Sequence, residues 1–142
     1  MDNMKNKLNF LMILLMVVLG TNHVSAQCSP ERILHQEGDT KLTIEDGRYY
    51  LAFQNKDQTV IDIAIISFSS KENVVAFFEA VDTLFENGYK TGDQITFDFA
   101  PPVSKTYKIF GVKIIGSNAN KYTYMTRPQC RRFLESLLVY KR

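Results

Sequence analysis

Histidine, cysteine and tryptophan are scarce in this chain of 142 residues, which has two histidines, two cysteines and no tryptophan. Beyond the first 26 residues, His35 is the one histidine that remains. A Ser-His-Asp triad would have to use it, and no G-x-S-x-G motif supplies the serine. A zinc site needs three or four ligands, which one histidine and two distant cysteines do not provide. We therefore interpret His35 as a surface or hinge residue.

Motifs for cofactors and metals are also missing. The sequence has no H-E-x-x-H, C-x-x-C, dinucleotide-binding or P-loop pattern, and NKDQTVID (55–62) lacks the spacing of a calcium loop. We expect no metal and no cofactor. Hydrolysis by paired carboxylates needs no histidine. Its candidates are Asp57, Asp62, Asp93 and Asp98. Asp62 interrupts an isoleucine-rich segment, where burial would raise its pKa.

The N-terminus has the pattern of an export signal. Two lysines precede the apolar run FLMILLMVVLG (10–20), and Val24 and Ala26 are small residues at the positions that a signal peptidase reads. The run is about half of the ~20 residues that span a bilayer. We predict that residues 1–26 are a cleaved signal peptide, with an uncleaved anchor as the alternative. The protein is then exported, periplasmic or secreted, without a transmembrane segment after cleavage.

The remainder, residues 27–142, contains 116 residues (142 − 26). A chain of that length forms one domain and buries about two-thirds of the surface that its unfolded form exposes. The sequence is 45% hydrophobic and 12% aromatic, which argues for a core and against disorder. We predict a single α+β domain over residues 27–142.

Alternating apolar residues predict antiparallel strands. KLTIE (41–45) and RYYLAFQ (48–54) flank Asp46-Gly47, a dipeptide suited to a type I′ turn, and together predict a hairpin. TVIDIAIISF (59–68) is apolar on both faces, which favours a central strand covered on each side. Further strands are expected at 94–99, at 104–116 (one strand with a bulge at Gly111, or two strands) and at 122–126.

Two segments repeat apolar residues at helical spacing. The first, 69–88, has capping-box spacing at Ser69 and Glu72 and a terminating glycine at Gly88. Its apolar stripe is Val74, Phe77, Phe78, Val81, Leu84 and Phe85. The second begins near Thr126, which has capping-box spacing with Gln129, and runs towards Tyr140; Arg127, which precedes a proline, is the alternative cap. Its predicted inner face is Cys130, Phe133, Leu134, Leu137 and Leu138.

The two stripes coincide when the sequence is shifted by 56 residues, and three strand-like segments precede each helix. We therefore predict an α+β fold of antiparallel sheet(s) with two amphipathic helices, in the order βββα-βββα, preceded by the cleaved signal peptide.

Charge divides the chain into two halves. Residues 27–100 carry 6 Lys/Arg and 13 Asp/Glu (net −7), whereas residues 101–142 carry 9 Lys/Arg and 1 Glu (net +8). Such a division can indicate a basic binding surface. We favour the other interpretation, that the halves neutralise each other within one small domain.

The basic half interleaves cations with tyrosines, a combination that suits anionic polymers, sugars and nucleic-acid strands. The possible binding surface comprises Lys105, Tyr107, Lys108, Lys113, Lys121, Tyr122, Tyr124, Arg127, Arg131 and Arg132. A half-exposed sheet with outward lysines is the plainer alternative. Nucleic acid is not expected outside the cell, so the partner is an unidentified protein or an anionic envelope polymer.

The two cysteines suggest a disulfide. A lipoprotein signal needs a small residue directly before its cysteine, and Gln27 occupies that place, so Cys28 is the second residue of the mature chain. An oxidising compartment favours disulfides, and Cys130 is the other cysteine. We predict a Cys28–Cys130 bridge closing a loop of about 100 residues, worth up to ~4–5 kcal/mol in the chain-entropy model.

These observations predict a small exported, non-catalytic protein that binds a partner, of the inhibitor, immunity, assembly or envelope-binding type. A histidine-independent hydrolase is the alternative and requires two carboxylates within ~5–10 Å of each other. A third hypothesis, self-association of acidic with basic halves, predicts a mass that falls as salt rises.

Overall fold

The computed structural model describes residues 30–57, 61–118 and 120–140. Residues 31–142 form one compact part of the chain, which contains both sheets and both helices. The first sheet contains β1 (Arg32–Glu37), β2 (Thr40–Glu45), β3 (Arg48–Gln54) and β4 (Ile63–Phe68), and is followed by α2 (Lys71–Thr83). The second contains β5 (Gln94–Ile95), β6 (Val103–Lys105), β7 (Val112–Ile115) and β8 (Tyr122–Met125), and is followed by α3 (Arg127–Val139).

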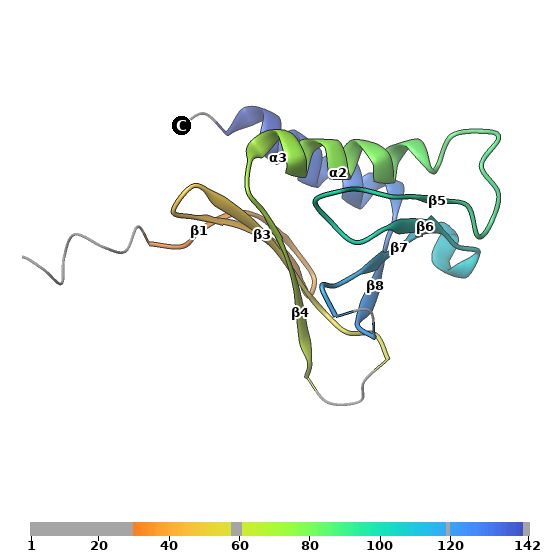
Figure 1. The fold of residues 1–142 in the computed structure, drawn as a ribbon, viewed down its shortest axis with the longest axis horizontal. Coiled ribbons are helices and arrows are strands. Elements are labelled where there is room, and N and C mark those ends of the chain that lie inside the picture. Colours follow the sequence, from red (N-terminus) through yellow and green to blue (C-terminus); the bar gives the residue numbers. More distant parts are fainter. Residues whose placement is uncertain (1–29, 58–60, 119, 141–142) are drawn as a thin grey trace, which may run out of the picture. The chain divides into compact units, whose positions relative to one another are not determined.

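Both sheets are antiparallel, and their strands lie side by side in chain order (Figure 1). The α+β class is therefore confirmed, but four strands rather than three precede each helix. The predicted hairpin is present, with positive φ at Asp46 (49°) and Gly47 (75°). Among the described residues, no helix has the length and hydrophobicity needed to cross a membrane.

Strand β1 was missing from the predicted set because its alternation is broken. The β1–β2 register shifts between Ile33 and His35, which is a β-bulge. A bulge places two residues of one strand opposite one residue of its neighbour, so apolar residues no longer recur at every second position. The segment RILHQE also has no fully buried residue, which leaves little apolar pattern to detect.

The prediction that residues 59–68 form a central strand is wrong. Strand β4 is an edge strand that pairs with β3. Its inward residues are buried, whereas the outward Ile63 and Ile65 are about half exposed, at 49% and 50%. These isoleucines line an open hollow of about 790 Å³ on the outer face of the sheet. Apolar residues on both faces therefore reflect an exposed apolar surface here, and not burial on both sides.

The predicted strand at 94–99 is also shorter than expected. Strand β5 ends at Ile95, and the residues after it form an aromatic cluster. The ring centre of Phe97 lies 5.4 Å from that of Phe77 and 5.1 Å from that of Phe99. The strand or strands expected at 104–116 are two, β6, which already begins at Val103, and β7, separated by a 3₁₀ turn at Lys108–Phe110. The aromatic contacts of Phe97 take the place of ladder hydrogen bonds.

The two helices have 13 residues each and begin 56 residues apart (127 − 71), at the shift that relates their apolar stripes. Helix α2 is capped by Ser70, one residue later than predicted, and ends at Thr83, with Leu84 rather than Gly88 as the residue that terminates it. Helix α3 begins after Thr126, whose backbone N–H and hydroxyl both donate to Gln129 Oε1, at 3.0 and 3.1 Å. The second predicted cap is therefore present.

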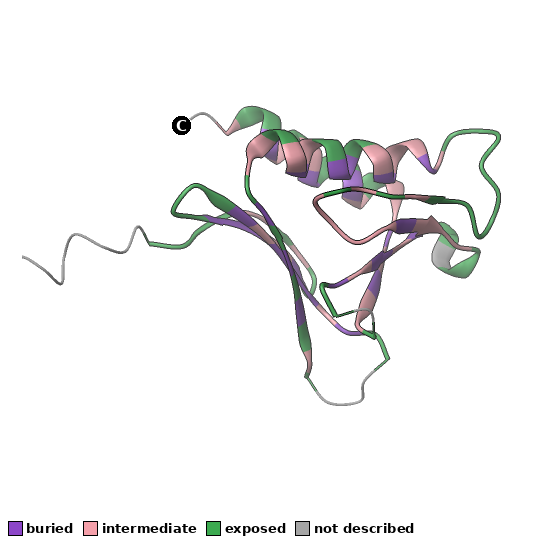
Figure 2. Ribbon diagram, in the orientation of Figure 1, coloured by how far each residue is buried: buried purple, intermediate pink, exposed green. Residues whose placement is uncertain are grey.

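Helices α2 and α3 pack against each other, and their buried residues lie on the sides that face the sheets (Figure 2). The rings of Phe78 and Phe133 stack at 5.5 Å with an angle of 5° between their planes. Beside them the buried Cys130 thiol donates to the Phe78 carbonyl at 3.1 Å, and burial raises its pKa to about 12. Cys28 and the predicted signal peptide lie outside the described residues, so the disulfide and the cleavage stay predictions.

Candidate binding surface

Of the seven cations among the ten predicted binding residues, the structure pairs four with carboxylates. This first group consists of Lys121 and the three arginines. Its ion pairs are Arg127–Asp82 (2.9 Å), Arg127–Glu86, Arg131–Asp82 (3.2 Å), Arg132–Glu37 and Lys121–Asp62 (2.7 Å). Each pair joins a cation of the basic half to a carboxylate of the acidic half. These four side chains therefore neutralise charge within the fold, as the favoured interpretation of the charge division expects.

These contacts also set the ionisation of the carboxylates. The hydrogen bonds from Arg127 and from Arg132 lower the pKa values of Asp82 and Glu37, respectively. The predicted rise in the pKa of Asp62 is wrong, because the hydrogen bond from Lys121 lowers it. Asp62 is partly exposed beside β4 and also accepts a hydrogen bond from Asn55 at 3.4 Å. It acts as an ion-pair partner that links the two sheets.

The second group lies on the outer face of the second sheet. In β7 and β8 every second residue is buried, so Lys113, Tyr122 and Tyr124 share the opposite, partly exposed face. Lys113 Nζ lies 4.4 Å from the ring centre of Tyr122, and Lys108 Nζ lies 5.9 Å from that of Tyr124. The two tyrosine rings meet edge to face at 5.5 Å. We call Lys108, Lys113, Tyr122 and Tyr124 the cationic–aromatic surface.

The lysines of this surface have no carboxylate partner among the residues that the structure describes. Tyr124 raises the pKa of Lys108 above its ordinary value. Desolvation, and then the charge of Asp57, raise the pKa of Tyr122. The nearby Lys105 donates to the Tyr89 carbonyl at 2.7 Å and belongs to neither group.

The connection between β6 and β7 extends this surface with exposed aromatic residues. Tyr107 is 73% exposed and Phe110 is 90% exposed. Phe110 also has a φ of 49°, a left-handed conformation that is unfavourable for a bulky side chain. Strained backbone and exposed aromatic rings both concentrate at binding sites. Sequence reasoning identified Tyr107 but missed Phe110, whose exposure no local pattern indicates.

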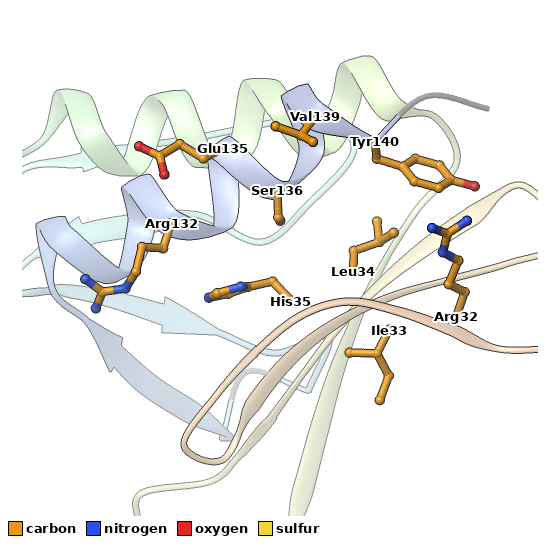
Figure 3. A pocket seen from close by; sticks show the side chains of 9 residues that line it. All are labelled: Arg32, Ile33, Leu34, His35, Arg132, Glu135, Ser136, Val139 and Tyr140. Atoms are coloured by element: carbon orange, nitrogen blue, oxygen red, sulfur yellow. The ribbon is translucent and has the colours of Figure 1, made fainter.

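A groove lies between β1 and α3, and Figure 3 shows the side chains around it. This β1–α3 groove has a volume of about 790 Å³. Its lining residues are Arg32, Ile33, Leu34, His35, Arg132, Glu135, Ser136, Val139 and Tyr140. The His35 ring packs edge-on against Phe133 at 4.6 Å, and its Nε2 lies 3.5 Å from Glu37 Oε2. His35 is thus a partly buried groove residue, which was not foreseen because β1 itself was not.

Two of the four carboxylates of the hydrolase hypothesis have other partners in the fold. Asp62 is paired with Lys121, and Asp93 accepts the backbone N–H of Lys90 at 2.7 Å within a turn. Within the described ranges, no hydrogen bond joins two of the four, and no three His, Cys, Asp or Glu side chains are grouped to hold a metal ion.

Comparison with protein-family models, with curated proteins and with solved structures finds no match to this chain. Its function is therefore inferred from its own residues.

Proposed function

We propose that this is an exported, non-catalytic binding protein that holds an anionic partner on the cationic–aromatic surface. The observation that carries the proposal is the contrast between its cations. Four of the predicted basic residues are paired with carboxylates, whereas Lys108 and Lys113 lie over tyrosine rings. Export is supported by the pattern of residues 1–26.

The tyrosines prepare the lysines for binding. A cation over an exposed aromatic ring gains about 0.5–1 kcal/mol, which restricts a side chain that would otherwise be mobile. Because less conformational entropy is lost when a partner arrives, a prepositioned ammonium binds an anion more tightly. The ring hydroxyls supply further donors, and the exposed Tyr107 and Phe110 offer apolar contact beside the charges. Carboxylate or phosphate groups along a polymer or an acidic protein segment fit this chemistry.

Binding to defined anionic polymers tests the proposal. We expect the protein to bind poly-glutamate or polygalacturonate in titration calorimetry at low salt, more weakly as salt rises. Replacing Lys108→Gln and Lys113→Gln together should weaken binding about tenfold, the effect of losing about 1.4 kcal/mol. The matched control, Lys41→Gln with Lys90→Gln, removes two charges elsewhere. Equal losses in both double variants, or no binding to any anion, would contradict the proposal.

A substitution at Tyr122 separates ring chemistry from simple charge. Tyr122→Phe keeps the aromatic face under Lys113 and should retain most of the affinity, whereas Tyr122→Leu removes that face and should weaken binding several-fold. If both variants bind equally, the aromatic ring has no part in the site.

A further inference from the structure

The two edges of the first sheet differ in how their main-chain groups are covered. At the β4 edge, the carbonyl of Ile65 accepts from Ser117 Oγ at 2.9 Å, and that of Ile63 lies 3.5 Å from Lys121 Nζ. At the outer edge of β1, no hydrogen bond to the main chain is found among the described residues. An uncovered edge presents donors and acceptors that pair readily with another strand.

The register shows which β1 groups point outward. Ile65, Ala52, Lys41 and Gln36 form one row across the sheet. The Ile65 carbonyl points away from β3, and main-chain groups alternate in direction from one row partner to the next. Ala52 and Lys41 therefore bond each other, and the N–H and C=O of Gln36 point away from β2. The same alternation directs the main-chain groups of Ile33 outward, because its partner on β2 lies two residues beyond Lys41.

The two ends of β1, RILHQE, carry opposite charges, Arg32 at one end and Glu37 at the other. A two-fold axis between Leu34 and His35 places Ile33 opposite Gln36, the two residues whose main-chain groups point outward. The same axis places Arg32 opposite Glu37. Opposite charges that face each other across a strand pair are favourable, and the pairs without main-chain hydrogen bonds hold their side chains closest.

Arg32 and Glu37 also lie on the same face of the strand. The Arg32 guanidinium is 4.9 Å from the Tyr140 ring centre, and Glu37 is paired with Arg132, so both side chains point towards α3. In Figure 3, Arg32, Leu34 and His35 extend to the α3 side of the strand and Ile33 to the other. The bulge between Ile33 and His35 interrupts the alternation of faces, so Leu34 and His35 both lie on the α3 side. Each proposed pair therefore joins two side chains on the same face of the sheet.

A β1–β1 pair must also accommodate the helices of both copies. The two helices pack against each other beside a sheet of four strands. Because neighbouring strands are about 4.8 Å apart, the sheet has a width of about 10 Å for each helix. If β1 of a second copy extends the sheet, the α3 helices of the two copies are separated by about the same distance, and packed helices are 8–10 Å apart. The end of α3 next to the groove carries Leu138 and Val139, which are 62% and 78% exposed.

We propose that β1 pairs with β1 of a second copy of this chain, about a two-fold axis between Leu34 and His35. The dimer joins the first sheet of each copy into one sheet of eight strands. The β1 edge of each copy is then covered by β1 of the other. A symmetric contact of this kind is closed and does not propagate into a filament. The contact does not involve the cationic–aromatic surface, so it does not depend on the proposed function.

Mass in solution tests the dimer. Sedimentation equilibrium at about 1–100 µM should give twice the mass of one chain. Gln36→Pro removes an outward N–H that the β1–β2 ladder does not use and should weaken dimerisation at least tenfold. Arg32→Glu places like charges opposite each other and should do the same. The control Arg48→Glu makes the same charge change at the exposed start of β3 and should leave the dimer intact, with circular dichroism confirming the fold of each variant.

Crosslinking then tests the register. In a Cys28→Ser background, the pair Arg32→Cys and Glu37→Cys should give a disulfide-linked dimer on mild oxidation, because opposed Cβ atoms lie about 4.5–5.5 Å apart. The pair Arg48→Cys and Glu37→Cys should not. A monomer throughout the concentration range would overturn the proposal and leave the edge to a different partner. The proposal would also be overturned if the Gln36→Pro and Arg32→Glu variants both remained dimeric, or if only the control pair of cysteines formed a crosslink.

Discussion

The two sheet–helix units share one order of elements but differ in how much of their structure is a hydrogen-bonded ladder. Strands β1 to β4 have 6, 6, 7 and 6 residues, whereas β5 to β8 have 2, 3, 4 and 4. The first unit is held by long strand pairs. The second depends more on side chains, including the Phe97 cluster that packs on Phe77 of α2. We infer that the second unit is stable only while it packs against the first.

The strongest way to break this dependence is to remove a ring between the helices. Phe133 of α3 is 1% exposed and stacks on Phe78 of α2. Phe133→Ala should lower the free energy of unfolding by about 3–5 kcal/mol, measured by urea denaturation. Leu138→Ala on the same helix is exposed and should cost under about 0.5 kcal/mol. Two separate unfolding transitions in the Phe133 variant would show that the second unit is stable by itself.

A smaller effect is expected where the sheets approach each other. A Cβ atom at Gly116, after β7, would lie 2.8 Å from Ala64 Cβ in β4, closer than two carbons can pack. Gly116→Ala should therefore destabilise the protein by about 1–3 kcal/mol in thermal or urea unfolding. Adding Ala64→Gly removes the clash and should recover part of that loss. If the double variant loses as much unfolding free energy as the two single variants together, the contact between Gly116 and Ala64 does not limit the approach of the sheets.

The smallest expected effect is the loss of an ion pair between the helices. Asp82 of α2 contacts Arg127 and Arg131 of α3 at the partly exposed surface. Asp82→Asn should lower stability at pH 7 by up to about 1 kcal/mol, since solvent screens the pair. The Arg127 hydrogen bond lowers the pKa of Asp82 from its ordinary value of 3.8. The stabilisation is thus present above that value and is lost as pH falls through the lower pKa of the folded protein.

Thermal unfolding as a function of pH measures this contribution. The difference in melting temperature between the original protein and Asp82→Asn should be largest near pH 7 and should shrink as the solution becomes more acidic than pH 3.8. Glu79→Gln, an exposed change on the same helix, serves as the control and should show a smaller difference. A difference that stays constant down to pH 2 would contradict an electrostatic origin.

Prediction from the sequence succeeded where neighbouring residues decide the structure. The β2–β3 hairpin follows from alternation around Asp46-Gly47, and the α3 cap from the spacing of Thr126 and Gln129. It failed where the outcome depends on distant parts of the chain. A bulge hid β1, and an exposed isoleucine face made the edge strand β4 resemble a central strand.

The sequence alone therefore determined the α+β class, the two helices and the opposite charges of the two halves, because periodicity and composition are local properties. Only the tertiary structure decided which cations are neutralised and which remain available. Arg127 meets a carboxylate 45 residues away and Arg132 one 95 residues away, whereas Lys108 and Lys113 meet tyrosines. It also decided which sheet edge stays open, since Ser117 covers β4 from 52 residues away and nothing comparable reaches β1 among the described residues. Such pairings depend on the distances between elements, which no single segment of sequence specifies.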